Sequence, residues 1–148
     1  MSTYIFDTEP LLAFLYDEPG AEVVADRLRQ IEAGTATGVI SHATAVEVIY
    51  KIARLETGSP NTVEPGEDEL AVGKRDLRIL QGFGIGIETP AYKRVARVKA
   101  SGGISLGDSY SVATADEHEG ILIVGTDPEF NELPIDVSTE RVVFSPDC

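Results

Sequence analysis

Four acidic residues of this 148-residue chain stand close to the ends of apolar segments or to the starts of helices, where a carboxylate can take part in catalysis. They are Asp7, Glu47, Asp108 and Asp127. Carboxylates that gather in one place repel one another unless a divalent cation neutralises them, and their hard oxygen atoms suit Mg²⁺ or Mn²⁺. Such ions activate water and orient a phosphate group. A cluster of these residues therefore predicts metal-dependent hydrolysis of a phosphodiester.

Short apolar segments separated by helical patterns surround these acids. Strands are predicted at residues 3–6, 39–40, 82–88, 121–124 and 142–144. Helices are predicted to begin at Pro10, after Gly20 and after Ser41, and to cover residues 67–81, 90–99 and 105–117. Strands that alternate with helices indicate one three-layer α/β/α domain over residues 1–148, with a central, mainly parallel sheet of four to five strands.

The expected topology brings the four acids to one edge of the sheet. Open parallel sheets bind ligands outside the carboxyl ends of their strands. Asp7 and Asp127 follow two of these strands, and Glu47 lies within two turns of the same edge. Asp108 is in the first turn of the helix that begins near Ser105. We therefore expect all four acids to hold the metal ion, directly or through water.

Each acid also has a purely structural explanation. Residues 105–108, Ser-Leu-Gly-Asp, have the form of a capping box, in which the serine and the acid satisfy amides at a helix start. Residues 44–47, Thr-Ala-Val-Glu, have the same form. Asp7 can cap the helix that follows it, and the Asp-Pro pair at 127–128 can form an ordinary turn.

The chain is strongly acidic: 25 Asp and Glu against 12 Lys and Arg give a formal net charge of -13. This balance argues against simple electrostatic binding of nucleic acid. It fits a halophilic protein, because charges are screened within about 3 Å at 1 M salt, and it also fits an acidic protein of an ordinary cytoplasm. With a lone Cys148, no signal-peptide pattern and no long apolar run, we expect a cytoplasmic protein without a membrane span.

Most of the basic residues nevertheless lie in one segment of the sequence. They are Lys74, Arg75, Arg78, Lys93, Arg94, Arg97 and Lys99. In the expected helix after Pro90, the basic residues form a stripe that can contact an RNA backbone. A solvated helix face, or the docking of an acidic partner, explains the same stripe.

Four stretches of the chain resemble the motifs of the PIN-domain ribonucleases, in particular the VapC-type toxins of toxin-antitoxin pairs. The opening Y-I-F-D-T-E-P-L-L-A-F-L is similar to the family's D-T-[SN]-x-L-[LI] segment, and S-H-A-T-A-V-E-V-I-Y-K to its S-x-x-[TS]-x-x-E-[VL] helix. Likewise I-S-L-G-D-S-Y-S-V-A resembles I-S-L-A-D-A-x-x-x-A, and V-G-T-D-P-E-F resembles the strand-end segment with a final acid and a Phe. The resemblance covers the chain from end to end. It places the family's four acids on Asp7, Glu47, Asp108 and Asp127.

The resemblance implies a PIN-like fold and a Mg²⁺- or Mn²⁺-dependent endoribonuclease that cuts RNA. It also implies inhibition by a small cognate antitoxin and assembly as a homodimer. The chain departs from the family pattern at three positions. Glu9 stands where Ser or Asn is usual, Gly107 replaces the commoner Ala, and Gly125 stands where a Thr often precedes the acid by two residues.

Two other functions fit some of the same residues. A catalytically inactive member of the fold would keep the acids for capping and solubility and would serve as a binding or scaffold protein. A phosphatase would use Asp7 as its nucleophile. Phosphatases of that kind typically need a D-x-D motif, and Glu9 supplies a longer acid instead.

Overall fold

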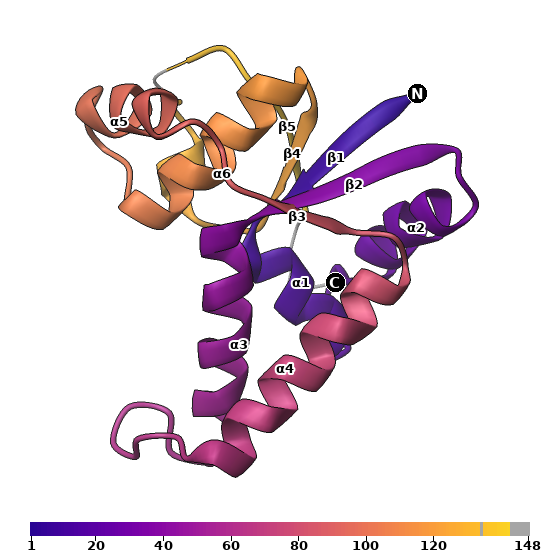
Figure 1. Cartoon of the computed structure of the whole chain (residues 1–148), viewed down its shortest axis with the longest axis vertical. Coiled ribbons are helices and arrows are strands. Elements are labelled where there is room, and N and C mark those ends of the chain that lie inside the picture. Colours follow the sequence, from indigo (N-terminus) through magenta and orange to yellow (C-terminus); the bar gives the residue numbers. More distant parts are fainter. Residues whose placement is uncertain (134, 143–148) are drawn as a thin grey trace.

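Five parallel strands form the central sheet of the computed structural model, which describes residues 1–133 and 135–142 (Figure 1). They are β1 (Ser2–Phe6), β2 (Ala36–Ser41), β3 (Gly86–Glu88), β4 (Ile121–Val124) and β5 (Ser138–Arg141). The strand order is β3-β2-β1-β4-β5, and every neighbouring pair is parallel. Parallel pairing places the carboxyl ends of all these strands along one edge of the sheet, as the sequence predicts.

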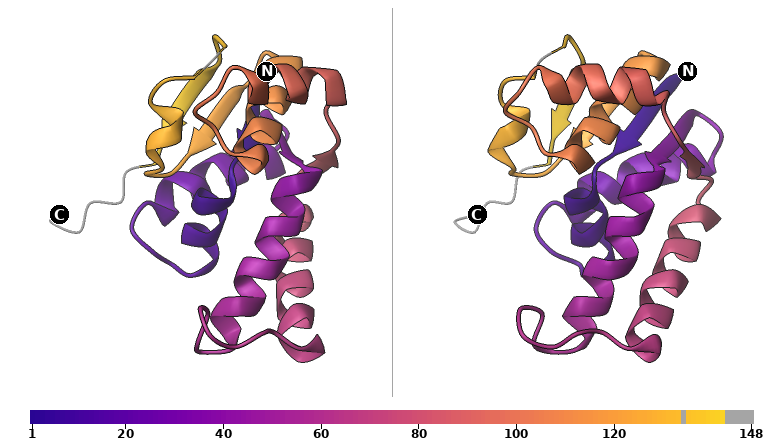
Figure 2. Two further views of the ribbon diagram at one scale, coloured as in Figure 1. Left: turned by 90° about the vertical axis from the view of Figure 1, so that its left-hand side faces the viewer. Right: turned by 60° about the vertical axis from the view of Figure 1, so that its left-hand side comes forward.

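Six α-helices of the described chain cover the two faces of the sheet and give the expected three-layer α/β/α fold (Figure 2). They are α1 (Thr8–Leu15), α2 (Ala21–Glu32), α3 (His42–Glu56), α4 (Glu67–Gly82), α5 (Tyr92–Ala100) and α6 (Leu106–His118). A short 3₁₀ helix, η1 (Pro128–Phe130), follows β4. Side chains of α1 to α4 pack on one face of the sheet, and those of α5 and α6 pack on the other.

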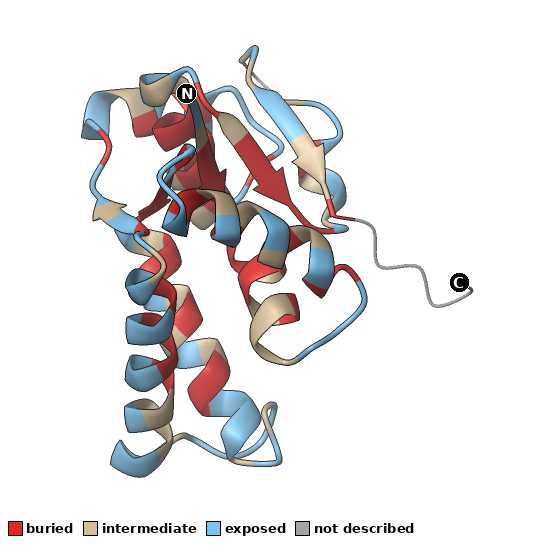
Figure 3. Cartoon of the chain, turned by 90° about the vertical axis from the view of Figure 1, so that its right-hand side faces the viewer, coloured by how far each residue is buried: buried red, intermediate tan, exposed pale blue. Residues whose placement is uncertain are grey.

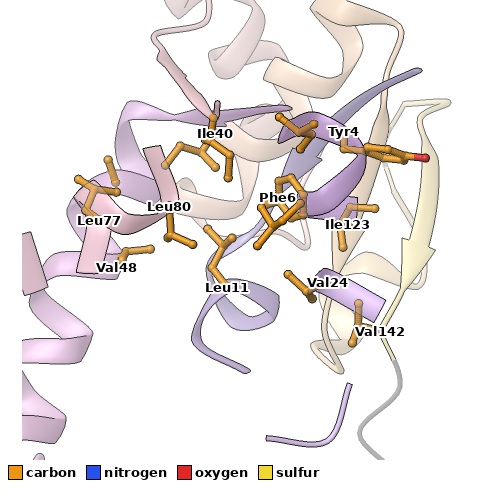
Figure 4. Close-up of a cluster of buried hydrophobic side chains, with 14 of the residues drawn as sticks. Tyr4, Phe6, Leu11, Val24, Ile40, Val48, Leu77, Leu80, Ile123 and Val142 are labelled. Atoms are coloured by element: carbon orange, nitrogen blue, oxygen red, sulfur yellow. The ribbon is translucent and has the colours of Figure 1, made fainter. Parts of the chain in front are cut away.

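Alternating side chains along the strands build one hydrophobic core on each face of the sheet. Tyr4 and Phe6 of β1 belong to the core shared with α1 to α4, whereas Ile5 belongs to the core shared with α5 and α6. In β4, Ile123 joins the first core and Leu122 the second. Figure 3 shows that the middle of the sheet is buried, and Figure 4 shows the side chains of the first core. The residue that follows β1 is therefore held by a strand packed on both faces.

The first helix begins two residues earlier than the proline predicts. Thr8 is the first residue of α1, so the chain passes from β1 into the helix through Asp7 alone. Pro10 is accepted in the first turn because the amides of a first turn have no partner within the helix. Asp7 consequently occupies the joint between the central strand and the first helix.

The last strand lies earlier in the chain than predicted. The sequence analysis places it at residues 142–144, whereas β5 covers Ser138–Arg141. Val142 follows β5 and donates its amide to the carbonyl of Val124 at 2.8 Å, and residues 143 and 144 lie outside the described residues. β5 is an edge strand with exposed or half-buried side chains, so its sequence is polar and gives no apolar signal.

Helices α3 and α4 pack together as a hairpin that projects away from the sheet (Figure 1). Residues 57–66 connect them. Among the residues that the structure describes, no helix has both the length and the apolar character needed to span a membrane.

Candidate active site

Asp7 lies at the carboxyl end of the central strand β1, and only 6% of its surface is exposed. Its amide donates to the carbonyl of Ile123 at 2.9 Å and so continues the pairing of β1 with β4. Asp7 is the N-cap residue of α1, but within residues 1–133 and 135–142 its side chain makes no capping hydrogen bond to this helix, so capping does not account for its carboxylate. Its carboxylate instead accepts a hydrogen bond of 3.1 Å from the Ser111 hydroxyl of α6.

A chain of buried hydroxyl groups orients the Ser111 donor. Ser41 Oγ lies 3.1 Å from Thr44 Oγ1, which lies 3.3 Å from Ser111 Oγ, and all three side chains are fully buried. Each hydroxyl has one proton, and an ionised carboxylate only accepts hydrogen bonds. Ser111 therefore donates to Asp7, Thr44 donates to Ser111, and Ser41 donates to Thr44. The Ser-x-x-Thr start of α3 both caps that helix, through the Thr44 amide, and supports the acid that follows β1.

The environment of Asp7 disfavours a lone negative charge. The pKa of Asp7 is raised from 3.8 to about 6, mainly by burial and to a smaller extent by the charge of Glu47, whereas hydrogen bonds from the Ser111 hydroxyl and the Thr8 amide lower it. The neighbouring Thr8 Oγ1 is buried and has no hydrogen-bond partner among the described residues. A buried acid and an unpartnered hydroxyl at one joint fit a site that binds a polar ligand.

Asp108 lies in the first turn of α6 and is 8% exposed. Ser105 caps this helix, because its Oγ accepts the amide of Asp108 at 3.2 Å. The amide of Ser105, which a capping box would pair with the acid at position 108, donates instead to Glu129 Oε2 at 3.1 Å. Helix capping therefore explains Ser105 and leaves the carboxylate of Asp108 to be explained by another role.

Asp108, Asp127 and Glu129 form a close cluster of acids. One carboxylate oxygen of each lies within 4.8 Å of the other two. Asp127 also caps η1, since its Oδ1 accepts the amide of Glu129 at 2.9 Å, so the turn explanation holds for part of its role. The three hard oxygen atoms suit a divalent cation.

The pKa values of the acids in this cluster also suit a site for a divalent cation. Burial, a hydrogen bond to Glu129 and the charges of Asp7 and Asp127 raise the pKa of Asp108 to about 9. The hydrogen bond to Asp108 lowers the pKa of Glu129. In the metal-free protein, a proton on Asp108 thus stabilises the pair that it forms with Glu129. A bound cation would take over that role.

Glu47 lies in α3, with its carboxylate against the first turn of α6. A Cβ atom built on Gly107 would be 2.6 Å from Glu47 Oε1, so glycine at this position leaves the space that the Glu47 carboxylate occupies. Lys51 Nζ lies 3.4 Å from Glu47 Oε2. Among the described acids, only Asp108, Asp127 and Glu129 have carboxylate oxygens within 4.8 Å of one another. Of the four acids that the sequence predicts, Glu47 and Asp7 therefore lie beside this cluster and not within it.

Glu129 belongs to this site although the sequence analysis does not include it. It lies two residues after Asp127, in the same strand-end stretch. The sequence does contain a hint of this role: the next residue, Phe130, is an aromatic residue typical of a core, and a buried Phe130 fixes the position of the acid before it. Phe130 is buried and anchors η1, which holds the preceding acid at the edge of the sheet.

A cavity of about 520 Å³ lies beside Glu47, between the starts of α3 and α6. Its lining includes Glu47, Gly107, Tyr50, Leu106 and Tyr110. Tyr50 and Leu106 are exposed large hydrophobic side chains, so the wall of this cavity is apolar.

The basic segment is divided between two parts of the molecule. Helix α4 packs on α3 and α5 packs on α6, so Figure 1 shows α4 and α5 far apart. In α5, Arg94 pairs with Asp116 and Glu117 of α6. The basic stripe of α5 is therefore partly neutralised, and the basic residues of α4 do not extend it.

Known proteins share both sequence features and fold with this chain. The PIN domain family matches residues 4–136 of the chain. A chain in the crystal structure of VapBC2 from Rickettsia felis bound to a DNA fragment from their promoter has a similar fold, with a TM-score of 0.66 and 15% sequence identity. That similarity covers 94% of this chain and 98% of the other. No curated protein sequence matches. Because the family match runs from β1 to the residues just before β5, the chain belongs to the PIN domain family.

Proposed function

We propose that this PIN-domain protein is a Mg²⁺- or Mn²⁺-dependent endoribonuclease and the toxin of a toxin-antitoxin pair. The observation that carries the proposal is the cluster of Asp108, Asp127 and Glu129, whose carboxylate oxygens lie within 4.8 Å of one another. Ionising several acids at one half-buried place is unfavourable without a counter-charge. A site that keeps them together therefore fits one that binds a divalent cation.

Each acid has a distinct part in this proposal. Asp108, Asp127 and Glu129 would hold the ion directly, and Asp7 and Glu47 would do so directly or through water. When bound, the ion supplies water activation and charge neutralisation at the scissile phosphate. Burial and neighbouring acids raise the pKa of Asp7 to about 6 and that of Asp108 to about 9 in the metal-free protein, so binding of the ion at neutral pH would release the proton held on Asp108.

RNA is the proposed substrate although the net charge of the chain is -13. The cavity beside Glu47 is lined by Tyr50 and Tyr110, and stacking of a base on an aromatic ring contributes about 1–3 kcal/mol without any positive charge. Lys93 and Arg97 of α5 are exposed and can add contacts to phosphate groups.

The motifs shared with VapC-type toxins support a small antitoxin as the protein partner, and a homodimer as the assembly. The similarity of fold to a chain of VapBC2 agrees with this assignment. We further propose one domain over residues 1–148 that acts in the cytoplasm. The excess of acidic residues supports a cytoplasm of high salt content, in which surface carboxylates maintain solubility.

The two other functions have less support. In a phosphatase, Asp7 and the acid two residues later would both act at the substrate, whereas Asp7 accepts a hydrogen bond from Ser111 and Glu9 accepts two from Thr126. In an inactive scaffold, the acids would serve for capping and solubility. Asp7 and Asp108 are buried and neither carboxylate is explained by a cap, so this alternative leaves both without a role.

Cleavage of RNA by the wild-type protein and by Asp108→Asn, in Mn²⁺ and in a chelator, tests the proposal. We expect cleavage by the wild type in Mn²⁺ alone and loss of at least a hundredfold in Asp108→Asn. Glu64→Gln, which removes one negative charge from the exposed loop before α4, is the matched control and should cleave like the wild type. Undiminished cleavage by folded Asp108→Asn, or cleavage in the chelator, would contradict the proposal.

A further inference from the structure

Glu9 makes two hydrogen bonds to the segment that carries Asp127. Its Oε2 accepts the amide of Thr126 at 3.1 Å, and its Oε1 accepts the hydroxyl of Thr126 at 2.8 Å. Glu9 lies in the first turn of α1, two residues after Asp7, and Thr126 directly precedes Asp127. The contact therefore joins the turns that carry two of the proposed metal-binding acids.

The absence of a side chain at position 125 is required by the same contact. A Cβ atom built on Gly125 would overlap the Cγ, Cδ and Oε2 atoms of Glu9. Glu9 and Gly125 are both departures from the family pattern. The structure shows that they complement each other, because the glutamate fills the space that the glycine leaves open.

Arg141 of β5 holds the same segment from the opposite side. Its guanidinium donates to the carbonyl oxygen of Gly125, to that of Asp127 at 3.4 Å and to Asn131 Oδ1 at 2.8 Å. Glu9 therefore accepts a hydrogen bond from the Thr126 amide, and Arg141 donates hydrogen bonds to the carbonyl groups of Gly125 and Asp127. Residues 125–127 are therefore held from two sides, by Glu9 of α1 and by Arg141 of β5.

We propose that Glu9 is a positioning residue for Asp127, an inference that rests on the proposed function. Asp127 lies within 4.8 Å of Asp108 and Glu129, so its place in the cluster depends on how the turn after β4 is held. The last backbone hydrogen bond between β1 and β4 is made by the amide of Asp7. The Glu9 contact extends this connection to Thr126 and keeps Asp127 close enough to share an ion. Residues that orient metal ligands in this way commonly change metal affinity by about 10–100-fold.

Titration with Mn²⁺ of the wild type, Glu9→Ala, Glu9→Gln, Gly125→Ala and the double variant Glu9→Ala/Gly125→Ala tests the inference. We expect Glu9→Ala to bind Mn²⁺ about 10-fold more weakly. Glu9→Gln keeps an acceptor for the Thr126 amide and should bind nearly as well as the wild type. Gly125→Ala should resemble Glu9→Ala, and adding it to Glu9→Ala should have little further effect, because the space is then vacant.

Two further readouts separate positioning from a merely structural role. Excess Mn²⁺ should restore RNA cleavage in Glu9→Ala, and it should not do so in Asp108→Asn. Exchange of the Thr126 amide with solvent should be faster in Glu9→Ala than in the wild type or Glu9→Gln, and this readout needs no metal.

The outcomes distinguish the inference from the proposed function. A wild type that binds Mn²⁺ and cleaves RNA, with Glu9→Ala of equal Mn²⁺ affinity, would overturn the inference alone. The inference alone would also be overturned if Gly125→Ala weakened Mn²⁺ binding equally with and without Glu9. A loss of Mn²⁺ affinity in Glu9→Gln as large as that in Asp108→Asn would likewise overturn it, because Glu9 would then be a direct ligand. A wild type without Mn²⁺ binding would overturn both.

Discussion

The hydroxyl of Ser111 donates a hydrogen bond of 3.1 Å to Asp7, a residue 104 positions earlier in the chain, and both side chains are buried. This bond connects helix α6 to the end of the central strand. It stabilises the ionised form of Asp7, the form that can bind a cation, against the effect of burial.

Replacing Ser111 by Ala is expected to raise the pKa of Asp7 further, because the bond that lowers it is lost. A hydrogen bond to a charged group contributes about 1.5–3 kcal/mol, so the shift should be about one unit or more. Titration of the Asp7 carboxyl carbon by NMR measures it. Ser109→Ala is the control, since Ser109 is also buried in α6 but donates to the carbonyl of Ser105. An unchanged Asp7 titration in Ser111→Ala would show that the bond does not act on the acid.

The stability of the metal-free protein should depend on pH through Asp7. Its pKa is raised in the folded state from 3.8 to about 6, so its contribution is fully present below pH 3.8 and is lost as the pH rises through 6. Asp108, with a pKa raised to about 9, extends the same loss to higher pH. In chelator at pH 8, Asp7→Asn should therefore be more stable than the wild type by about 2–3 kcal/mol, and near pH 4 the difference should disappear. Urea unfolding at the two pH values measures this, and a difference independent of pH would contradict it.

Addition of Mn²⁺ should offset the loss of stability that the metal-free protein shows as the pH rises. The ion binds the folded wild type and neutralises its acids, so the rise in melting temperature caused by Mn²⁺ should be larger at pH 8 than at pH 5. Thermal unfolding with and without the ion measures the rise. Asp108→Asn should show little rise at either pH. An equal rise in Asp108→Asn and the wild type would place the bound ion elsewhere.

Gly107→Ala should separate helix stability from site geometry. Alanine favours a helix over glycine by up to about 1 kcal/mol, but its Cβ would lie 2.6 Å from Glu47 Oε1 and move that carboxylate aside. We expect equal or higher stability together with a severalfold loss of RNA cleavage. Gly82→Ala, at the end of α4 with no described atom within 4 Å of its added Cβ, should leave cleavage unchanged. Full activity in Gly107→Ala would mean that the position of Glu47 is unimportant.

Features that depend on neighbouring residues in the sequence could be predicted. Ser41 and Ser105 cap helices as expected, and the strands before Asp7 and Asp127 place these acids at one edge of the sheet. The final strand could not be predicted, because an edge strand with polar side chains resembles a loop. Residues 142–144 appear more strand-like only because they are apolar.

Features that depend on distant segments were not accessible from local patterns. The hydroxyl chain from Ser41 to Asp7 requires α3, α6 and β1 to meet, and no spacing in the sequence encodes that meeting. The contact of Glu9 with Thr126 joins residues 117 positions apart. Glu9 could only be noticed as a departure from the family, and its role follows from the structure.

The central claim is that the acids at the edge of the sheet bind a divalent cation, and anomalous diffraction from a crystal soaked in Mn²⁺ tests it most directly. The account predicts an anomalous peak among Asp108, Asp127 and Glu129, at about 2.1 Å from their carboxylate oxygens, and no peak there in crystals of Asp108→Asn. A fully occupied Mn²⁺ at another place, with none among these carboxylates, would contradict it.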